Sequence, residues 1–261
     1  MAGLLRTLFR SLLQMSADLN VDTDRQPKWR HICEHLSDFP LQERNGTTVF
    51  RYSEKGLAWC DSNTLGIHHI FPAGAIGLDS DPRLLEICRN TLTEMARWHD
   101  GNGFSSWYTA CARVGYDPKT ILARFRVECD RQSFPNLVLQ YGGGGIENVG
   151  GFLAINEMML QSHEGVIRLF PVWPKDQTAR FGGLRTVGAL LVSAELKDGL
   201  ISAVKIHSEK GRDCTVENPW PGRKIRLARN ANPAEIMTGN RVTFKTTPGE
   251  NIELAPPESN P

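Results

Sequence analysis

Residues 81–118 read DPRLLEICRNTLTEMARWHDGNGFSSWYTACARVGYDP, and this stretch decides the fold of the first part of the chain. It begins and ends with an Asp-Pro pair, Asp81-Pro82 and Asp117-Pro118. An aspartate accepts hydrogen bonds from the free amides of a helix start, and proline fits the first helical position because its missing N–H costs nothing there. The residues between predict two helices, separated by a turn at 98–103 and closed by Gly115. The unit is therefore a pair of antiparallel helices.

The helical pattern extends in both directions from this stretch. Met1 to Leu19 carries apolar residues at helical spacing, and Pro27 opens a second predicted helix. Pro118 opens a further helix, and the segment from Phe152 to His163 predicts the last one. We therefore predict a domain of helical hairpins, a partial (α/α)6-type barrel, over residues 1–165.

The second part of the chain has the spacing of strands. Leu190 to Glu195 predicts a strand, Asp198-Gly199 a hairpin turn, and Ile201 to Ile206 the returning strand. Further short strands are predicted at Cys214–Val216, Lys224–Leu227 and Arg241–Lys245. We predict a small antiparallel β-sandwich domain over residues 166–254 and a Pro-rich disordered tail at 255–261. The fold class is α+β.

Composition excludes several classes of function. The 261 residues include 30 basic and 29 acidic side chains, a net charge of +1, which gives no field for gathering phosphates. No apolar run approaches the roughly 20 residues of a membrane helix. We therefore expect no nucleic-acid and no membrane partner. The six cysteines form no CxxC pair and favour buried thiols over disulfides or zinc, so we expect no metal and no cofactor.

The N-terminal residues do not identify a targeting signal. Arg6 and Arg10 precede the first acid, Asp18, which faintly resembles a transit peptide. The apolar spacing there favours an amphipathic helix packed in a larger fold, and no secretory core or cleavage site follows. The localisation is left unknown.

The sharpest local feature is the glycine-rich stretch from Tyr141 to Gly151. Four consecutive glycines, Gly142–Gly145, allow the backbone to bend freely and a ligand to approach closely. The stretch lacks the spacing of a phosphate-binding loop, so nucleotide binding is not predicted. Glu147 and Asn148 follow at a helix start, where a carboxylate beside an amide could hold and activate a water molecule. The alternative is a flexible surface loop.

A second group of polar and aromatic residues lies at the turn from Trp98 to Gly103. Asp100 and Asn102 could cap the next helix or bind sugar hydroxyls, and the two alternatives are about equal. Trp98 could stack on a sugar ring, and Trp107 is a second aromatic side chain that could do the same.

The adjacent histidines His68 and His69 lie in a segment rich in glycine and proline. Neighbouring side chains point in different directions on any regular element, so a two-histidine metal site is not predicted. One of them is expected to be a core histidine. Long ordered loops of this kind are often functional.

Several motifs resemble glycoside hydrolase family 95, which contains α-L-fucosidases and α-L-galactosidases. The most specific is Glu157-Met-Met-Leu-Gln-Ser-His163, preceded by Gly150-Gly151 and followed by Ile167–Pro171. Looser similarities cover most of residues 60–210, including Trp173-Pro174, Gly182–Arg185, Ile70–Gly74, Gly103–Trp107 and Ala112-Arg113.

The resemblance implies a fold and a mechanism. The family has an (α/α)6 barrel of six helical hairpins followed by a small β-domain, and its enzymes invert configuration with two carboxylic acids. Aligned without a gap, Ile146 takes the place of the family's base-side aspartate, while Asn148 keeps the family's asparagine. Glu147, displaced by one residue, could replace that aspartate, or the site could be altered. The family's general acid would lie N-terminal to Met1.

The resemblance therefore leads to a first hypothesis, a glycoside hydrolase made of the C-terminal barrel half and the β-domain. Glu147 and Asn148 would be catalytic. The substrate, an oligosaccharide or glycoside, would contact His68, His69, Trp98, Asp100, Asn102, Trp107 and Tyr141. An N-terminal barrel half or a second copy would cover the exposed helix faces, and the family would place the protein in the periplasm or outside the cell if that half carries a signal. The second hypothesis is a non-catalytic carbohydrate-binding protein, and a third is a structural β-domain with a helical adaptor.

Overall fold

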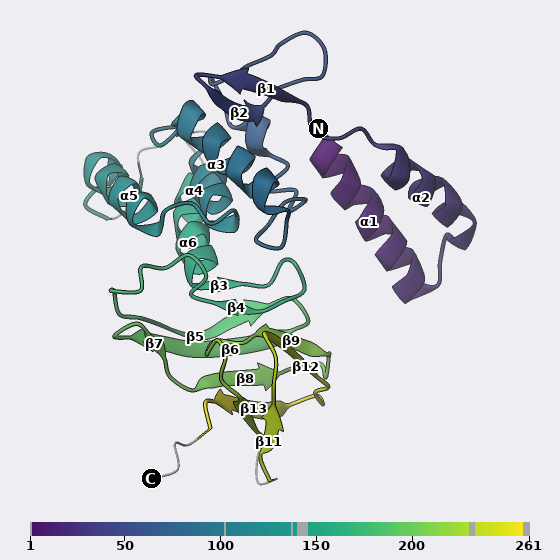
Figure 1. Cartoon of the computed structure of the whole chain (residues 1–261), viewed down its shortest axis with the longest axis vertical. Helices are drawn as coiled ribbons and strands as arrows, with labels where there is room; N and C mark the ends of the chain where they lie inside the picture. The colour runs from purple at the N-terminus through teal and green to yellow at the C-terminus, as the bar shows by residue number, and fades with distance from the viewer. Residues whose placement is uncertain (1, 102, 137, 140–145, 230–232, 258–261) are drawn as a thin grey trace. The chain divides into compact units, whose positions relative to one another are not determined.

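The computed structural model describes the chain except for residues 1, 102, 137, 140–145, 230–232 and 258–261 (Figure 1). The side chains of Ser105 and of residues 146–148 also lie outside the description. The chain forms two compact units, Met1–Ile155 and Asn156–Pro261, which we call the helical unit and the β-unit. Helices and antiparallel strands are thus segregated along the chain, as an α+β protein requires.

The division between the units falls inside the last helix, whereas the expected boundary was at residue 165. The last turn of that helix belongs to the β-unit, where the Phe170 and Val172 amides donate to the carbonyls of Met159 and Met158, at 2.6 and 3.3 Å. These bonds tie the last helical turn to the chain that follows the first strand pair.

The helical unit contains six α-helices, two 3-10 turns and one hairpin among its described residues. In chain order they are α1 (Ala2–Leu19), η1 (Thr23–Arg25), α2 (Gln26–His35), β1 (Leu41–Arg44), β2 (Thr47–Phe50), η2 (Leu65–Ile67), α3 (Pro82–Met95), α4 (Phe104–Arg113), α5 (Pro118–Gln132) and α6 (Ile146–Met159). Helix α1 packs on α2, α4 on α5, and α3 on strand β2.

Both Asp-Pro helix starts are confirmed. The Asp81 carboxylate accepts the Arg83 amide at 2.8 Å, and the Asp117 carboxylate accepts the Thr120 amide and hydroxyl at 2.7 and 2.6 Å. Gly115 adopts φ +66° after α4, as predicted for the residue that ends a helix. The local signals therefore set the limits of α3, α4 and α5.

Helix α6 begins six residues earlier than predicted, at Ile146 instead of Phe152. The glycines at 150 and 151 were interpreted as part of a loop, but both lie within the helix. A Cβ atom on Gly151 would lie 2.9 Å from Phe125 Cζ and 3.3 Å from Phe104 Cε1. Gly151 therefore allows the helix to pass close to two aromatic rings. Glycine weakens a helix by its propensity, and that local signal does not reveal this packing role.

The β-unit contains a seven-stranded antiparallel sheet in the order β11-β10-β13-β8-β6-β5, with β7 paired to β6. Two short pairs, β3–β4 and β9–β12, accompany it. The strands are β3 (Leu160–Gln161), β4 (Arg168–Leu169), β5 (Ala179–Thr186), β6 (Leu190–Lys197), β7 (Leu200–Ile201), β8 (Val204–Ser208), β9 (Cys214–Glu217), β10 (Ile225–Arg229), β11 (Glu235–Met237), β12 (Arg241–Phe244) and β13 (Glu250–Ala255).

One hydrophobic core joins the large sheet to the β9–β12 pair. Val192 of β6 and Ile206 of β8 share it with Val216 of β9 and Phe244 of β12. The sequence missed β5, β11 and β13. The expected disordered tail began at Ala255, but this residue ends strand β13, where it pairs with Arg226. A strand in the middle of a sheet is specified by its neighbours, which lie far away in the sequence.

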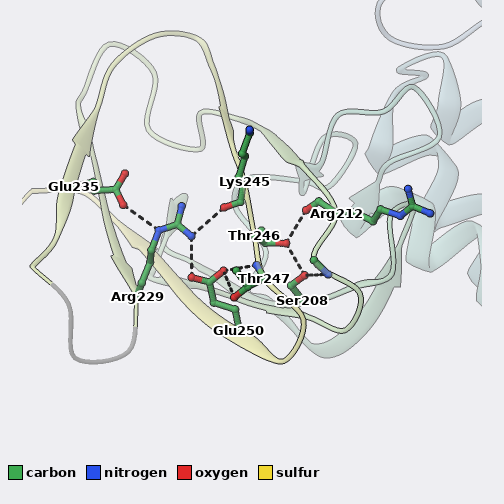
Figure 2. Close-up of polar contacts among 9 residues, drawn as sticks. Ser208, Arg212, Arg229, Glu235, Lys245, Thr246, Thr247 and Glu250 are labelled. Atoms are coloured by element: carbon green, nitrogen blue, oxygen red, sulfur yellow. Dashed lines mark hydrogen bonds and ion pairs between the residues drawn. The ribbon is translucent and has the colours of Figure 1, made fainter.

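A polar network secures the return from β12 to β13 (Figure 2). Glu250 accepts Arg229 Nη1 at 2.8 Å and the Thr247 amide at 2.8 Å, while Arg229 also bonds Glu235 at 3.0 Å and the Lys245 carbonyl at 3.0 Å. Burial alone would raise the pKa of Glu250, but its hydrogen bonds to Arg229 and Thr247 outweigh this and lower it. Glu250 is thus an ionised hub that fixes the loop.

Asp117→Ala is expected to lower the free energy of unfolding of the helical unit by about 1 kcal/mol, because α5 loses its cap. Hydrogen bonds from the Thr120 side chain and amide lower the pKa of Asp117 from 3.8. The cap therefore stabilises fully above that pH and is lost as the carboxylate protonates in stronger acid. Urea denaturation at neutral and at strongly acidic pH measures both effects. Asp117→Asn keeps an acceptor oxygen, so an equal loss in this control would contradict the capping role.

Glu250→Ala is expected to destabilise the β-unit by about 2–3 kcal/mol, because a largely buried Arg229 loses its partner and the Thr247 amide its acceptor. The matched control is Glu235→Ala, which removes the exposed carboxylate on the same arginine and should cost at most about 1 kcal/mol. Thermal unfolding of the two variants gives the comparison. Equal losses would show that the network does not depend on the buried member.

Candidate functional site

The helical unit contains a cavity of about 770 Å³, a size suited to a small-molecule ligand. It is formed by the segment before and after η2, the turn that leads into α4, and the first turns of α6. Its lining residues are Asn63, Thr64, Leu65, His68, Phe71, Pro72, Asp100, Gly103, Ser106, Val149, Gly150 and Leu153. The cavity therefore brings together three of the segments that the sequence singled out.

Asp100 is the fixed charge of this cavity. Its carboxylate is buried, accepts the Gly103 amide at 3.0 Å and pairs with Arg97 Nη2 at 2.7 Å. A Cβ atom on Gly103 would lie 2.3 Å from Thr64 Cγ2 and 2.8 Å from Asp100 Oδ2, so a larger residue here would displace both side chains. Asp100 thus holds the turn before α4 and lines the cavity; its contact with sugar hydroxyls stays a prediction.

The two histidines separate, as adjacent side chains should. His68 is half-buried on the cavity, and burial lowers its pKa, so its ring is neutral at pH 7. His69 is buried between the rings of Phe39 and Phe50, with centroids at 4.8 and 4.2 Å. Burial lowers the pKa of His69 to about 3, and its Nε2 atom has no hydrogen-bond partner among the described residues. His69 is a core histidine, although not a fully hydrogen-bonded one.

The two predicted tryptophans lie in an aromatic cluster of the core. Trp107 is fully buried and meets Trp98 edge to face, with ring centroids 5.8 Å apart. Trp98 is 6% exposed and contacts Tyr108 and Tyr116 in the same way, at 5.6 Å each. Rings buried in this manner stabilise the fold and present no face to a ligand. Trp98 and Trp107 are therefore left out of the proposed sugar site.

The predicted catalytic pair lies at the start of α6. The backbone of Glu147 and Asn148 forms the first helical turn, directly before Val149 and Gly150, which line the cavity. Their side chains lie outside the description, as do the predicted site residues Asn102 and Tyr141. Of the nine predicted site residues, His68 and Asp100 are those whose described side chains line the cavity.

Sequence reasoning missed the hydroxyl groups of the cavity. Thr64 and Ser106 are buried, and their oxygens lie 3.1 Å apart. Arg97, the partner of Asp100, was also missed. Serine, threonine and arginine are common on any surface, so no local signal separates these three from others. The sequence offers only the glycine- and proline-rich character of the segment around His68 and His69 as a pointer toward Thr64, which lines the cavity.

A comparison with known families bears on the β-unit. Residues 161–254 match the model of glycoside hydrolase family 95, C-terminal domain. The β-unit carries the family 95 resemblance. The match begins inside the Glu157–His163 motif and confirms the resemblance seen in the sequence. A search of curated proteins found no match. The match lies within the β-unit and covers less than half of the chain.

Two further observations concern metal binding and membrane-spanning helices. Among the described residues, no group of three or more His, Cys, Asp or Glu side chains could hold a metal ion. In the same part of the chain, no helix is long and apolar enough to cross a membrane.

The buried His69 predicts a pH dependence of stability. Its ring is neutral when folded and titrates near pH 6.5 when unfolded, so the helical unit is most stable above pH 6.5 and loses stability as the pH falls. Between pH 6.5 and 5 the loss should reach about 2 kcal/mol. Urea midpoints measured over this range test it. His69→Phe should flatten the dependence, and the exposed His35→Gln should leave it unchanged; an unaltered slope in His69→Phe would contradict the assignment.

Proposed function

We propose that the protein is a glycoside hydrolase that acts on an α-L-fucoside or α-L-galactoside. The family 95 C-terminal domain of the β-unit carries this proposal. The cavity of the helical unit supports it, because it is large enough for a sugar and lined by one carboxylate, one neutral histidine, an amide and two hydroxyl groups. Such a lining suits a ligand with many hydroxyl groups and no charge.

Glu147 is the proposed base-side carboxylate, which removes a proton from the attacking water, and Asn148 is its orienting partner. The start of α6 supports these roles, since the backbone amides of a first helical turn stabilise a negative charge. Asp100, held by Arg97 and the Gly103 amide, is proposed to accept sugar hydroxyls. His68 in its neutral form can donate to one hydroxyl and accept from another.

The general acid is proposed to come from outside this helical unit. Several large apolar side chains of its helices are exposed, which is costly for a unit that stays alone in water. Leu8 of α1 is 50% exposed, and Val149 and Phe152 of α6 are 63% and 74% exposed. We propose that a further set of helical hairpins, or a second copy, covers these faces, completes an (α/α)6 barrel and supplies the acid.

The proposed division of labour predicts which substrates this chain can cleave by itself. Fluoride leaves a sugar with little acid assistance, so α-L-fucosyl fluoride should be hydrolysed slowly, while an alkyl α-L-fucoside should be stable. Glu147→Gln should lower the fluoride reaction at least a hundredfold and leave the circular dichroism spectrum unchanged. Glu164→Gln, a change of the same kind in the β-unit, is the matched control. An unchanged rate in Glu147→Gln would remove this residue from the mechanism.

The alternative is a non-catalytic carbohydrate-binding protein. Calorimetric titration with fucosides and galactosides, run beside the hydrolysis assay, distinguishes the two functions. Binding without product from any substrate favours the alternative, and Asp100→Asn should weaken binding in both cases. Absence of both binding and turnover would overturn both functions.

A further inference from the structure

The β-unit has a concave surface of its own, a trough of about 540 Å³ on one face of its large sheet. The trough crosses strands β6, β8, β13 and β10, and it lies on the face opposite the hydrophobic core. Side chains alternate along each strand, so Val192, Ile206 and Ile252 belong to the core while their neighbours face the trough; Ile206 and Ile252 also form part of its floor. This surface belongs to no part of the function proposed above.

The strand register places the polar residues of the trough in two parallel rows. Lys205 pairs with Ser193 on one side and with Glu253 on the other. Two residues further along β8, His207 pairs with Leu191 of β6 and Asn251 of β13. Neighbouring strands lie about 4.8 Å apart, so a row across four strands spans roughly 15 Å.

Small residues keep the two ends of the trough open. Gly183 stands at one end, in a bulge of β5, with φ +65°. Its amide donates to Ser193 Oγ at 2.9 Å, which fixes the bulge. Ala228 of β10 stands at the other end, opposite Glu253. A ligand longer than the trough could therefore extend beyond both ends.

The polar groups are positioned by each other. His207 Nδ1 lies 2.8 Å from Asn251 Oδ1, and this contact does not use the Asn251 amide nitrogen or the second ring nitrogen of His207. Glu253 lies 3.6 Å from Arg226. Donors and acceptors thus alternate across the trough, and its lining holds one cation, Lys205, and one carboxylate, Glu253, which also pairs with Arg226.

This chemistry excludes two common kinds of ligand. An extended peptide binds a sheet by adding a strand to an open edge, but β6, β8 and β13 are each paired on both sides. An anionic polymer requires an excess of positive charge, which the Glu253 carboxylate opposes. A chain of neutral hydroxyl groups fits both the length and the alternation.

We propose that the trough is a second carbohydrate-binding site, which holds a neutral oligosaccharide of several sugar units apart from the catalytic cavity. The choice of a sugar as the hydroxyl-bearing ligand rests on the proposed function. The site binds through hydrogen bonds with Ser193, Lys205, His207, Asn251 and Glu253, of which the Glu253 carboxylate accepts, and Leu191 is an apolar contact. It would hold the protein on a long substrate while the cavity acts on one of its branches.

Native gel electrophoresis in the presence of soluble polymers tests this proposal without turnover. The whole chain should be retarded by neutral xyloglucan and not by anionic polygalacturonate. His207→Ala/Asn251→Ala should reduce the retardation about tenfold, because two hydrogen-bonding groups are lost. Ala228→Trp, which fills one end of the trough, should reduce it to a similar extent without removing any polar group. The matched control is Thr215→Ala/Thr243→Ala, which removes a 2.9 Å cross-strand pair from the β9–β12 hairpin.

The outcomes separate this proposal from the proposed function. Retardation that Asp100→Asn abolishes and the trough variants do not would place all binding in the cavity and overturn the second site. Retardation by polygalacturonate alone, or by neither polymer, would overturn it as well. Loss of hydrolysis in Glu147→Gln concerns the catalytic proposal alone, since retardation is measured without cleavage.

Discussion

The close approach of α6 to the rings of Phe104 and Phe125 is the constraint on which the candidate site depends. A Cβ atom at Gly151 would collide with the ring of Phe125 and press against that of Phe104, so the helix can lie this close because residue 151 has no Cβ. This approach brings Val149, Gly150 and Leu153 to the wall of the cavity. The same rings belong to the aromatic cluster with Tyr108, so the core of the unit and one wall of the cavity share a single packing arrangement.

Gly103 imposes a second constraint of the same kind. It lets the turn before α4 pass against Thr64 while its amide holds the Asp100 carboxylate. The cavity is thus bordered at two places by glycines that permit close contact, and its polar groups are fixed by the backbone. A binding site held in this way is preorganised, because its carboxylate does not need to be ordered when a ligand arrives.

Local chemistry explains which parts of the fold were predictable. The starts of α3 and α5 depend on Asp81 and Asp117, and their capping contacts are made within the helix itself. The close packing of α6 at Gly151 depends on Phe104 and Phe125, which the sequence around this glycine does not contain. Strand β13 likewise owes its place to β8 and β10. The candidate site shows the same contrast. His68 and His69 are adjacent residues of the same type, so the sequence does not distinguish them. Tertiary packing places His68 on the cavity and His69 between the rings of Phe39 and Phe50.

The β-unit shows how one alternating pattern yields two surfaces. Along β8, Val204 and Ile206 are buried in the core, and Lys205 and His207, which alternate with them, face the trough. A sequence pattern identifies the buried half of such a strand, but it leaves the other half as ordinary polar surface. The partners of Lys205 and His207 come from β6 and β13, so the rows of donors and acceptors exist only after the strands have paired. Register, which the hydrophobic face determines, therefore also determines the chemistry of the opposite face.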